Sequence, residues 1–142
     1  MTAPGPRRPA RFERPFAVAP EDIDQLGHVN NVVYLRWVQE IAVAHWRAAA
    51  PAQLQADVVW VVLRHEIDYQ RPARGGDTVL GCTWVGDATG SRFERFTEFS
   101  RAGSSEVLAR ARSVWCPLNA RTGRPRRIDP ALHDHFSEPA SP

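Results

Sequence analysis

Residues 30–51 read NNVVYLRWVQEIAVAHWRAAAP, and this stretch decides the fold. Its apolar side chains recur at steps of three and four residues, the period of an α-helix: Tyr34, Trp37, Val38, Ile41, Ala42 and His45. The pattern predicts a helix of about five turns. Asn30 or Asn31 is suited to cap its start, and Pro51 stops it. The apolar surface is broader than one stripe, so we expect cover on more than one side.

Alternating segments flank this helix and predict β-strands. Residues 12–19, FERPFAVA, predict a first strand, and Pro15 favours a place at the edge of a sheet. Four more segments follow the helix: 56–72, 76–87, 91–103 and 105–118. Short turn signals separate them, which predicts that each strand pairs with the next. In the first of the four, one parity is apolar and is expected on one face: Val59, Val61, Leu63, Ile67 and Tyr69.

The predicted order is one strand, a long helix and four strands. Such a helix is buried most simply by an antiparallel sheet of about five strands wrapped around it, which makes an α+β fold. A length of 142 residues suits a single domain, residues 1–142. We expect residues 1–10 to be a flexible tail and residues 119–142 to be an ordered C-terminal extension that frays at its end. Open sheet edges favour self-association into a homo-oligomer.

Composition excludes several classes of partner. The formal charge of +2 is too small to indicate nucleic acid, and no apolar run is long enough to cross a membrane. No apolar stretch follows the basic N-terminus, so it does not have the pattern of a secretory signal and we expect a cytoplasmic protein. All 18 basic residues are arginine, so each one is able to bind a phosphate or carboxylate through two parallel hydrogen bonds.

A polar stretch precedes the helix, and it carries a resemblance. Residues 22–40, DIDQLGHVNNVVYLRWVQE, resemble the signature of the hot-dog-fold acyl-CoA thioesterases of the 4-hydroxybenzoyl-CoA thioesterase family. Residues 28–34, HVNNVVY, are also similar to plant acyl-carrier-protein thioesterases, and residues 67–79, IDYQRPARGGDTV, are similar to the family's strand and turn after the helix. The resemblance implies a sheet wrapped around a helix, assembled as dimers or tetramers with sites between subunits.

The resemblance also implies roles for individual residues. Asp24 matches the catalytic carboxylate, and Asn31 matches the residue at the helix start whose backbone N–H polarises the thioester carbonyl. Gly27 matches a small residue in the turn between them. His28, Asn30 and Tyr34 match positions whose roles vary across the family. The plant enzymes have Asn where this chain has Leu26, which weakens the case for His28 in catalysis.

These residue types suit thioester hydrolysis. Unpaired N–H groups at a helix start can receive the negative charge that develops on the carbonyl oxygen. Asp24 is able either to attack the carbonyl directly or to activate a water molecule, and both routes stay open. The reaction needs no metal and no cofactor, since coenzyme A enters as part of the substrate. Asp22 is expected in a turn or at the surface, and Glu40 is expected in solvent or paired with Arg36.

Two groups of arginines are candidates for contact with the substrate. Arg71 and Arg74 lie in QRPARGG, where they either bind coenzyme A phosphates or form a solvated turn. A second cluster could serve the nucleotide or a carrier protein: Arg121, Arg124, Arg126 and Arg127. His45 and His65 fall on apolar parities and are expected to be structural.

The leading prediction is therefore a hydrolase that cleaves an acyl-CoA or acyl-carrier-protein thioester to free acid and thiol. One alternative is a hot-dog enoyl-CoA hydratase or dehydratase, which carries Asp and His five residues apart around an Asn-Pro pair. Here Asp24 and His28 are four apart and that pair is missing. Another alternative is a non-catalytic acyl-CoA-binding protein, whose known examples add a DNA-binding module. The length of the acyl chain is not predicted.

Overall fold

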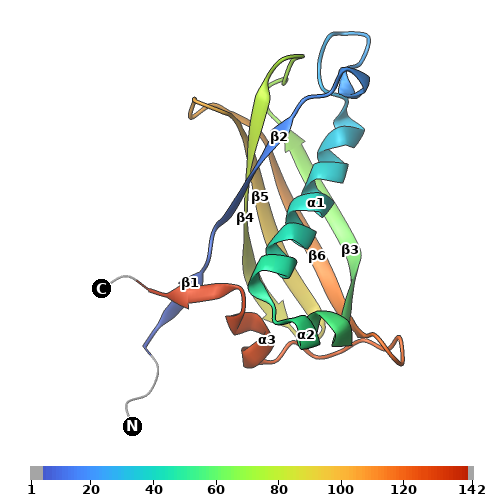
Figure 1. Ribbon diagram of the computed structural model, residues 1–142, viewed down its shortest axis with the longest axis vertical. Helices are drawn as coiled ribbons and strands as arrows, with labels where there is room; N and C mark the ends of the chain where they lie inside the picture. The colour runs from blue at the N-terminus through green and yellow to red at the C-terminus, as the bar shows by residue number, and fades with distance from the viewer. Residues whose placement is uncertain (1–4, 141–142) are drawn as a thin grey trace.

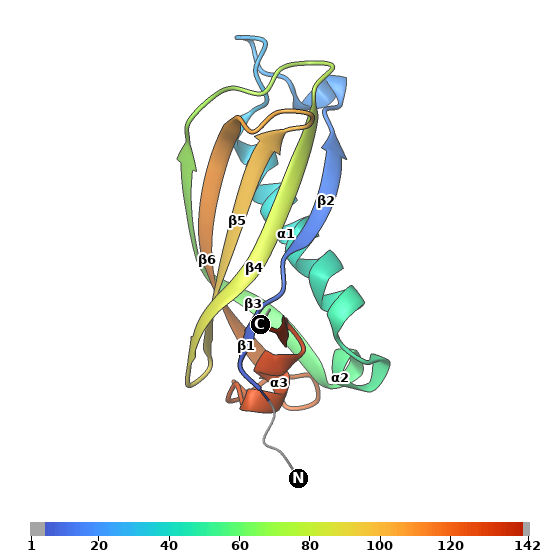
Figure 2. The ribbon, with the colours of Figure 1, turned by 90° about the vertical axis from the view of Figure 1, so that its left-hand side faces the viewer.

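The computed structural model describes residues 5–140 and consists of an antiparallel sheet with one long helix along one of its faces (Figures 1 and 2). The strand order is β2-β4-β5-β6-β3. The prediction of a five-stranded sheet around a long helix is confirmed. The elements of this unit are α1 (Asn31–Ala49), β2 (Phe12–Ala17), β3 (Val58–Tyr69), β4 (Thr78–Thr89), β5 (Arg92–Arg101) and β6 (Val107–Asn119).

The pairing of the strands differs from the prediction at one place. β4 pairs with β5 and β5 with β6, as expected, but β3 pairs with β6 rather than with β4. The prediction was wrong because β4 already lies between β2 and β5, so its two edges are filled. The connection over residues 70–77 therefore crosses one end of the sheet, and β2 and β3 become the two edge strands. The edge position predicted for the strand that contains Pro15 is confirmed.

A β-bulge in β3 changes which face its side chains occupy. The register with β6 shifts between Val62 and Arg64, so that Leu63 is the extra residue. Val59 and Val61 are exposed, whereas Ile67 packs against the core under α1. The prediction that one parity of this strand shares one face was therefore wrong, since a bulge reverses the alternation.

The helix α1 has nearly the predicted bounds. Asn30 is its N-cap, and its side chain accepts a hydrogen bond of 3.1 Å from the N–H of Val32. A short helix that the sequence did not predict, α2 (Ala52–Asp57), follows directly. Gly81 lets α1 lie close to β4, because a Cβ at this position would stand 3.0 Å from Cδ1 of Ile41. No helix within residues 5–140 is both long and apolar enough to span a membrane.

The two ends of the chain form a small second sheet. β1 (Arg7–Pro9) pairs with β7 (Ser137–Pro139), which follows the short helix α3 (Pro130–Asp134). The prediction of a flexible tail over residues 1–10 was therefore wrong for Arg7–Pro9, because β7 supplies backbone partners. Residues 1–4 and 141–142, including the end expected to fray, lie outside the described range. Phe136, between α3 and β7, is buried against the second half of α1.

Candidate functional site

The polar stretch before α1 forms a narrow hairpin at the end of the sheet where α1 begins (Figure 1). It follows the 3₁₀ helix η1 (Pro20–Asp22). The N–H of Asn30 donates to the carbonyl of Asp22, and the N–H of Asp24 donates to the carbonyl of His28, both at 2.8 Å. Gly27 adopts φ 78° at the tip, a conformation that favours glycine. The chain thus returns on itself, as expected for a small residue in this turn.

Asp24 is half-buried within this hairpin. Its Oδ1 accepts hydrogen bonds from the N–H groups of Leu26 at 2.8 Å and His28 at 3.1 Å. No residue in the range 5–140 donates a hydrogen bond to its Oδ2. The hairpin pairing places Asp24 two residue pairs from Asn30, about 7 Å along the strand direction. One carboxylate oxygen therefore orders the turn, and the other is available for chemistry.

The first N–H groups of α1 differ in how they are paired. The N–H of Val32 is bound by the Asn30 side chain, and the N–H of Val33 donates to the Asn30 carbonyl at 2.9 Å. Within the described part of the chain, the N–H of Asn31 has no acceptor. It lies at the positive end of the helix dipole, where an oxygen that gains negative charge is stabilised.

A second loop, residues 70–77, lies against this hairpin. The N–H of Val29 donates to the carbonyl of Ala73 at 2.8 Å, and His28 and Arg74 form a β-bridge. The side chain of Arg74 is exposed and forms no ion pair with any residue of the range 5–140. Arg71 is also exposed, but its guanidinium lies 3.4 Å from Glu106. The structure therefore brings Arg74 beside the hairpin without an ion pair in the described range, although its charge helps to lower the pKa of Asp77, after the hydrogen bonds of Asp77 to the Arg74 N–H and to Arg101. Arg71 is partly neutralised by Glu106.

The acid buried at the site is Asp22, which sequence analysis placed in a turn or at the surface. It lies in a turn, but its side chain is only 3% exposed. Its carboxylate accepts hydrogen bonds of 3.0 Å from the N–H of Ala19 and from Arg36. Burial alone raises the pKa of Asp22, and these hydrogen bonds outweigh it, so the pKa lies below its ordinary value. The signal for this role is Arg36 on the nearest turn of α1.

Tyr34 of α1 and Tyr69 of β3 hold the start of α1 against the sheet. Tyr34 is buried, and its ring packs edge-on against Tyr69 at 5.5 Å between centroids. The hydroxyl of Tyr69 donates to the carbonyl of Asn31 at 3.1 Å. Tyr34 was predicted as a site residue, whereas Tyr69 was predicted only as part of the apolar face of its strand. Both serve here to hold the helix start in position.

Other candidates lie away from the hairpin. β6 runs from Val107, near the site, to Asn119, which pairs with Val58 at the opposite end of β3. The second arginine cluster follows Asn119 and is therefore at the far end of the sheet from Asp24.

Glu40 is paired with Arg36 at 3.5 Å, as expected. The two histidines expected to be structural are both buried or half-buried and hydrogen-bonded: His45 to Arg95, and His65 to Ser113.

The chain matches a known family along most of its length. Residues 18–136 match the family model described as the thioesterase-like superfamily. The chain belongs to this superfamily. Solved thioesterase structures confirm the predicted hot-dog fold. The 1,4-dihydroxy-2-naphthoyl-CoA thioesterase Slr0204 from Synechocystis superposes with a TM-score of 0.76 at 21% identity, covering 89% of this chain and 96% of that one.

Two further thioesterases are similar to this chain in sequence. A thioesterase from Thermus thermophilus, solved with coenzyme A and Zn, has 27% identity and a TM-score of 0.75, covering 87% of this chain and 90% of that one. The chloroplastic palmitoyl-acyl carrier protein thioesterase of Cuphea hookeriana is 27% identical over 140 residues, which are 88% of this chain. The present chain spans only 33% of the length of that plant protein.

Proposed function

We propose that this chain hydrolyses an acyl thioester to a free acid and a thiol, with Asp24 as the catalytic carboxylate. One observation carries the proposal: a half-buried carboxylate with a free oxygen lies in a hairpin that returns to the unpaired N–H of Asn31. The substrate carbonyl would accept a hydrogen bond from this N–H. A tetrahedral oxyanion formed at that place gains from the helix dipole and from the N–H together.

Two mechanisms of hydrolysis account for every bond that forms and breaks. In one, Asp24 attacks the carbonyl carbon, the C–S bond breaks, the thiolate leaves, and water then hydrolyses the mixed anhydride. In the other, Asp24 takes a proton from water, the resulting hydroxide attacks the same carbon, and the C–S bond breaks to release the acid and the thiolate, which is then protonated. A thiolate is a good leaving group, so neither route needs a strong acid. Neither route needs a metal or a redox cofactor.

The donor of the acyl group is an acyl-CoA or an acyl-carrier protein in this proposal. Arg74 supports a phosphate-bearing donor, since its exposed guanidinium lies on the loop that pairs with His28. Both donors carry a phosphopantetheine arm, and coenzyme A adds further phosphates. Related proteins act on both kinds of donor, as the names of the Synechocystis and Cuphea hookeriana enzymes state. We place the reaction in the cytoplasm on the sequence expectation alone.

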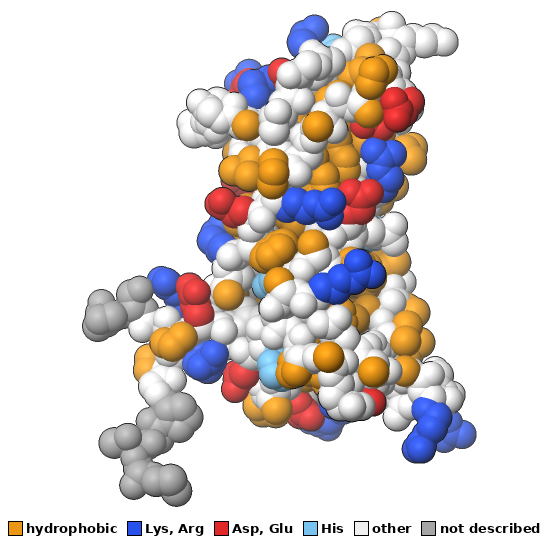
Figure 3. Space-filling view, in the orientation of Figure 1, with side chains coloured by type: hydrophobic (Ala, Val, Ile, Leu, Met, Phe, Trp, Pro, Cys, Tyr) orange, Lys and Arg blue, Asp and Glu red, His pale blue; other side chains and the backbone are white. Residues whose placement is uncertain are grey.

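We further propose that two copies of the chain assemble through the open edge of β3. β3 is an edge strand, and exposed apolar side chains lie on its outer face at Val59, Val61 and Leu63. The surface over α1 also carries apolar side chains between charged ones (Figure 3), and Val32 is 66% exposed there. A long, apolar edge strand of this kind favours pairing with another strand. A second copy would enclose the hairpin, which is open to solvent in one chain.

The test of the function is thiol release from a panel of short, long and aromatic acyl-CoA substrates. Asp24→Asn keeps an oxygen that accepts the turn hydrogen bonds, but it cannot act as nucleophile or base. We expect this variant to fold as the wild type does and to lose roughly 100-fold or more of the rate. Asp87→Asn, a change of the same kind at an exposed position, should keep the rate. Equal rates for Asp24→Asn and wild type would remove Asp24 from the mechanism.

A further inference from the structure

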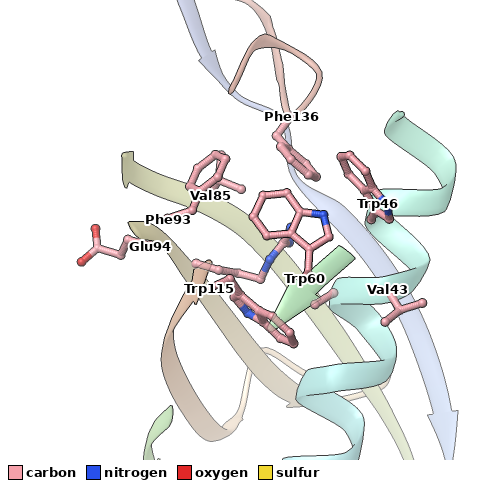
Figure 4. Close-up of a pocket in the computed structure, with 10 residues that line it drawn as sticks. Val43, Trp46, Trp60, Val85, Phe93, Glu94, Trp115 and Phe136 are labelled. Atoms are coloured by element: carbon pink, nitrogen blue, oxygen red, sulfur yellow. The ribbon is translucent and has the colours of Figure 1, made fainter. Parts of the chain in front are cut away.

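A cavity lies at the opposite end of α1 from the hairpin, between α1, the sheet and the C-terminal extension (Figure 4). Its volume is about 50 Å³. No residue of the Asp24 hairpin lines it, and on α1 Val43 lies twelve residues beyond Asn31, about 18 Å along the axis. Five of the ten residues that line it are aromatic: Trp46, Trp60, Phe93, Trp115 and Phe136.

One cation, Arg95 of β5, lines this apolar space. Its side chain is only 6% exposed. Nη1 donates to Oγ1 of Thr83 at 3.1 Å and lies 2.9 Å from Nδ1 of His45. The guanidinium carbon lies 5.3 Å from the centre of the Phe136 ring. All three neighbours are neutral, because burial and then the charge of Arg95 lower the pKa of His45 to about 3.

Arg95 has no acid to balance its charge. No carboxylate in the range 5–140 lies within ion-pair distance of it, although buried charges are normally paired. The adjacent Glu94 points away from the cavity in Figure 4 and binds Arg112 at 2.6 Å. The guanidinium remains protonated at neutral pH, since burial lowers its pKa only to about 10.

The cavity wall also has more donors than acceptors. Nε and Nη2 of Arg95 form no hydrogen bond with any described residue, which leaves three N–H groups unpaired. Because these unpaired groups are donors, the missing partner is an acceptor, and the charge of Arg95 makes an anion the best one.

We propose that this cavity binds a small monocarboxylate, whose carboxylate pairs with Arg95 and whose compact apolar body contacts the aromatic wall. Two parallel N–H groups of a guanidinium match the two oxygens of a carboxylate. A phosphate would leave the aromatic wall without an apolar partner. The exposed Val43 on the rim places one side of the cavity at the surface of the chain. The site does not depend on thioester hydrolysis, because it shares no residue with the hairpin.

Calorimetric titration of the full-length chain with sodium butyrate at pH 7 and fixed ionic strength tests the proposal. Butyramide is the matched neutral ligand, since it has the same size and shape without the charge. We expect saturable binding of one butyrate per chain and at least tenfold weaker binding of butyramide. Butyrate that does not bind, or that binds no tighter than butyramide, would overturn the site without any variant.

Two variants of the same strand locate the binding. Arg95→Met should weaken butyrate at least tenfold and abolish the preference over butyramide. Arg92→Met removes the same charge from an exposed position of β5 and should leave the affinity unchanged. Equal affinities in the two variants would overturn the assignment. If Arg95→Met does not fold, Ala42→Leu is the deciding variant, because its larger side chain fills the cavity from α1. Loss of butyrate binding in this variant supports the site, and unchanged binding overturns it.

Discussion

Asp22 and Arg36 form an ion pair of 3.0 Å that ties the site hairpin to the second turn of α1. The two partners differ in environment: the Asp22 side chain is almost fully buried, and the Arg36 side chain is half-exposed. The carbonyl of Asp22 also receives the N–H of Asn30. One residue thus holds both the helix cap and the base of the hairpin that carries Asp24, which makes Asp22 a positioning residue for the proposed reaction.

We expect Asp22→Asn to lower the free energy of unfolding by about 1–3 kcal/mol, because a buried hydrogen bond to a charged group is lost. Urea unfolding at pH 7 measures this change. Glu40→Gln is the matched control, since it removes the other, more exposed partner of Arg36 and should cost less than about 1 kcal/mol. Equal losses in the free energy of unfolding would show that the buried Asp22–Arg36 pair contributes no more than the exposed Glu40–Arg36 pair.

His45 predicts a dependence of stability on pH. Its pKa is lowered from 6.5 to about 3 in the folded chain, by burial and then by Arg95. Between these values the unfolded chain binds one proton more, so the free energy of unfolding falls as the pH falls, by at most about 1.4 kcal/mol per pH unit. His45→Gln keeps an acceptor for Arg95 and should reduce the difference in stability between pH 7 and pH 5.

The measurement is urea unfolding of wild type, His45→Gln and His135→Gln at both pH values. His135→Gln is the control of the same type, because His135 forms no hydrogen bond with Arg95, and the loss of slope in His45→Gln should exceed that in His135→Gln. A His45→Gln variant with the wild-type slope would contradict the assignment of that slope to His45.

Local pattern predicted much of this fold. The apolar period fixed α1 almost to the residue, and Pro15 correctly indicated an edge strand. The pairing of β3 with β6 was missed because turn signals report only neighbours in sequence. The bulge at Leu63 was missed because nothing in the alternation marks an extra residue. Strand order and bulges depend on contacts between distant segments.

The same limit applies to the side chains of the site. A turn at Gly27 was predicted from a motif, and the structure forms a hairpin there and pairs its backbone with the loop that carries Arg74. The burial of Asp22 was not predicted, because an acid in a turn is exposed in most contexts. Arg95 shares the inward parity of Phe93 and Thr97, and this alternation was the available signal. A charged residue at an inward-facing strand position indicates either that the strand was assigned wrongly or that the charge binds a partner inside the fold.

Arg74 and Arg71 should differ in their effects on substrate affinity. Arg74→Met is expected to raise KM for an acyl-CoA about tenfold with little change in kcat, since a phosphate contact acts equally on ground and transition states. Arg71→Met removes a cation that Glu106 already partly neutralises, and a change of less than threefold is expected. Steady-state thiol release for both variants makes the comparison. A larger KM effect for Arg71→Met would reverse the assignment.

The edge of β3 predicts the state of assembly. Val61 lies on the outer face of that strand and is 36% exposed in the single chain. Val61→Glu would bury a charge between copies if this strand is part of an interface, so we expect the molar mass from light scattering to fall toward that of one chain, 15.9 kDa. Thr89→Glu places the same charge at an exposed end of β4 and should keep the wild-type mass. A wild-type chain that is already monomeric, or a Val61→Glu variant of unchanged mass, would exclude this strand from the interface.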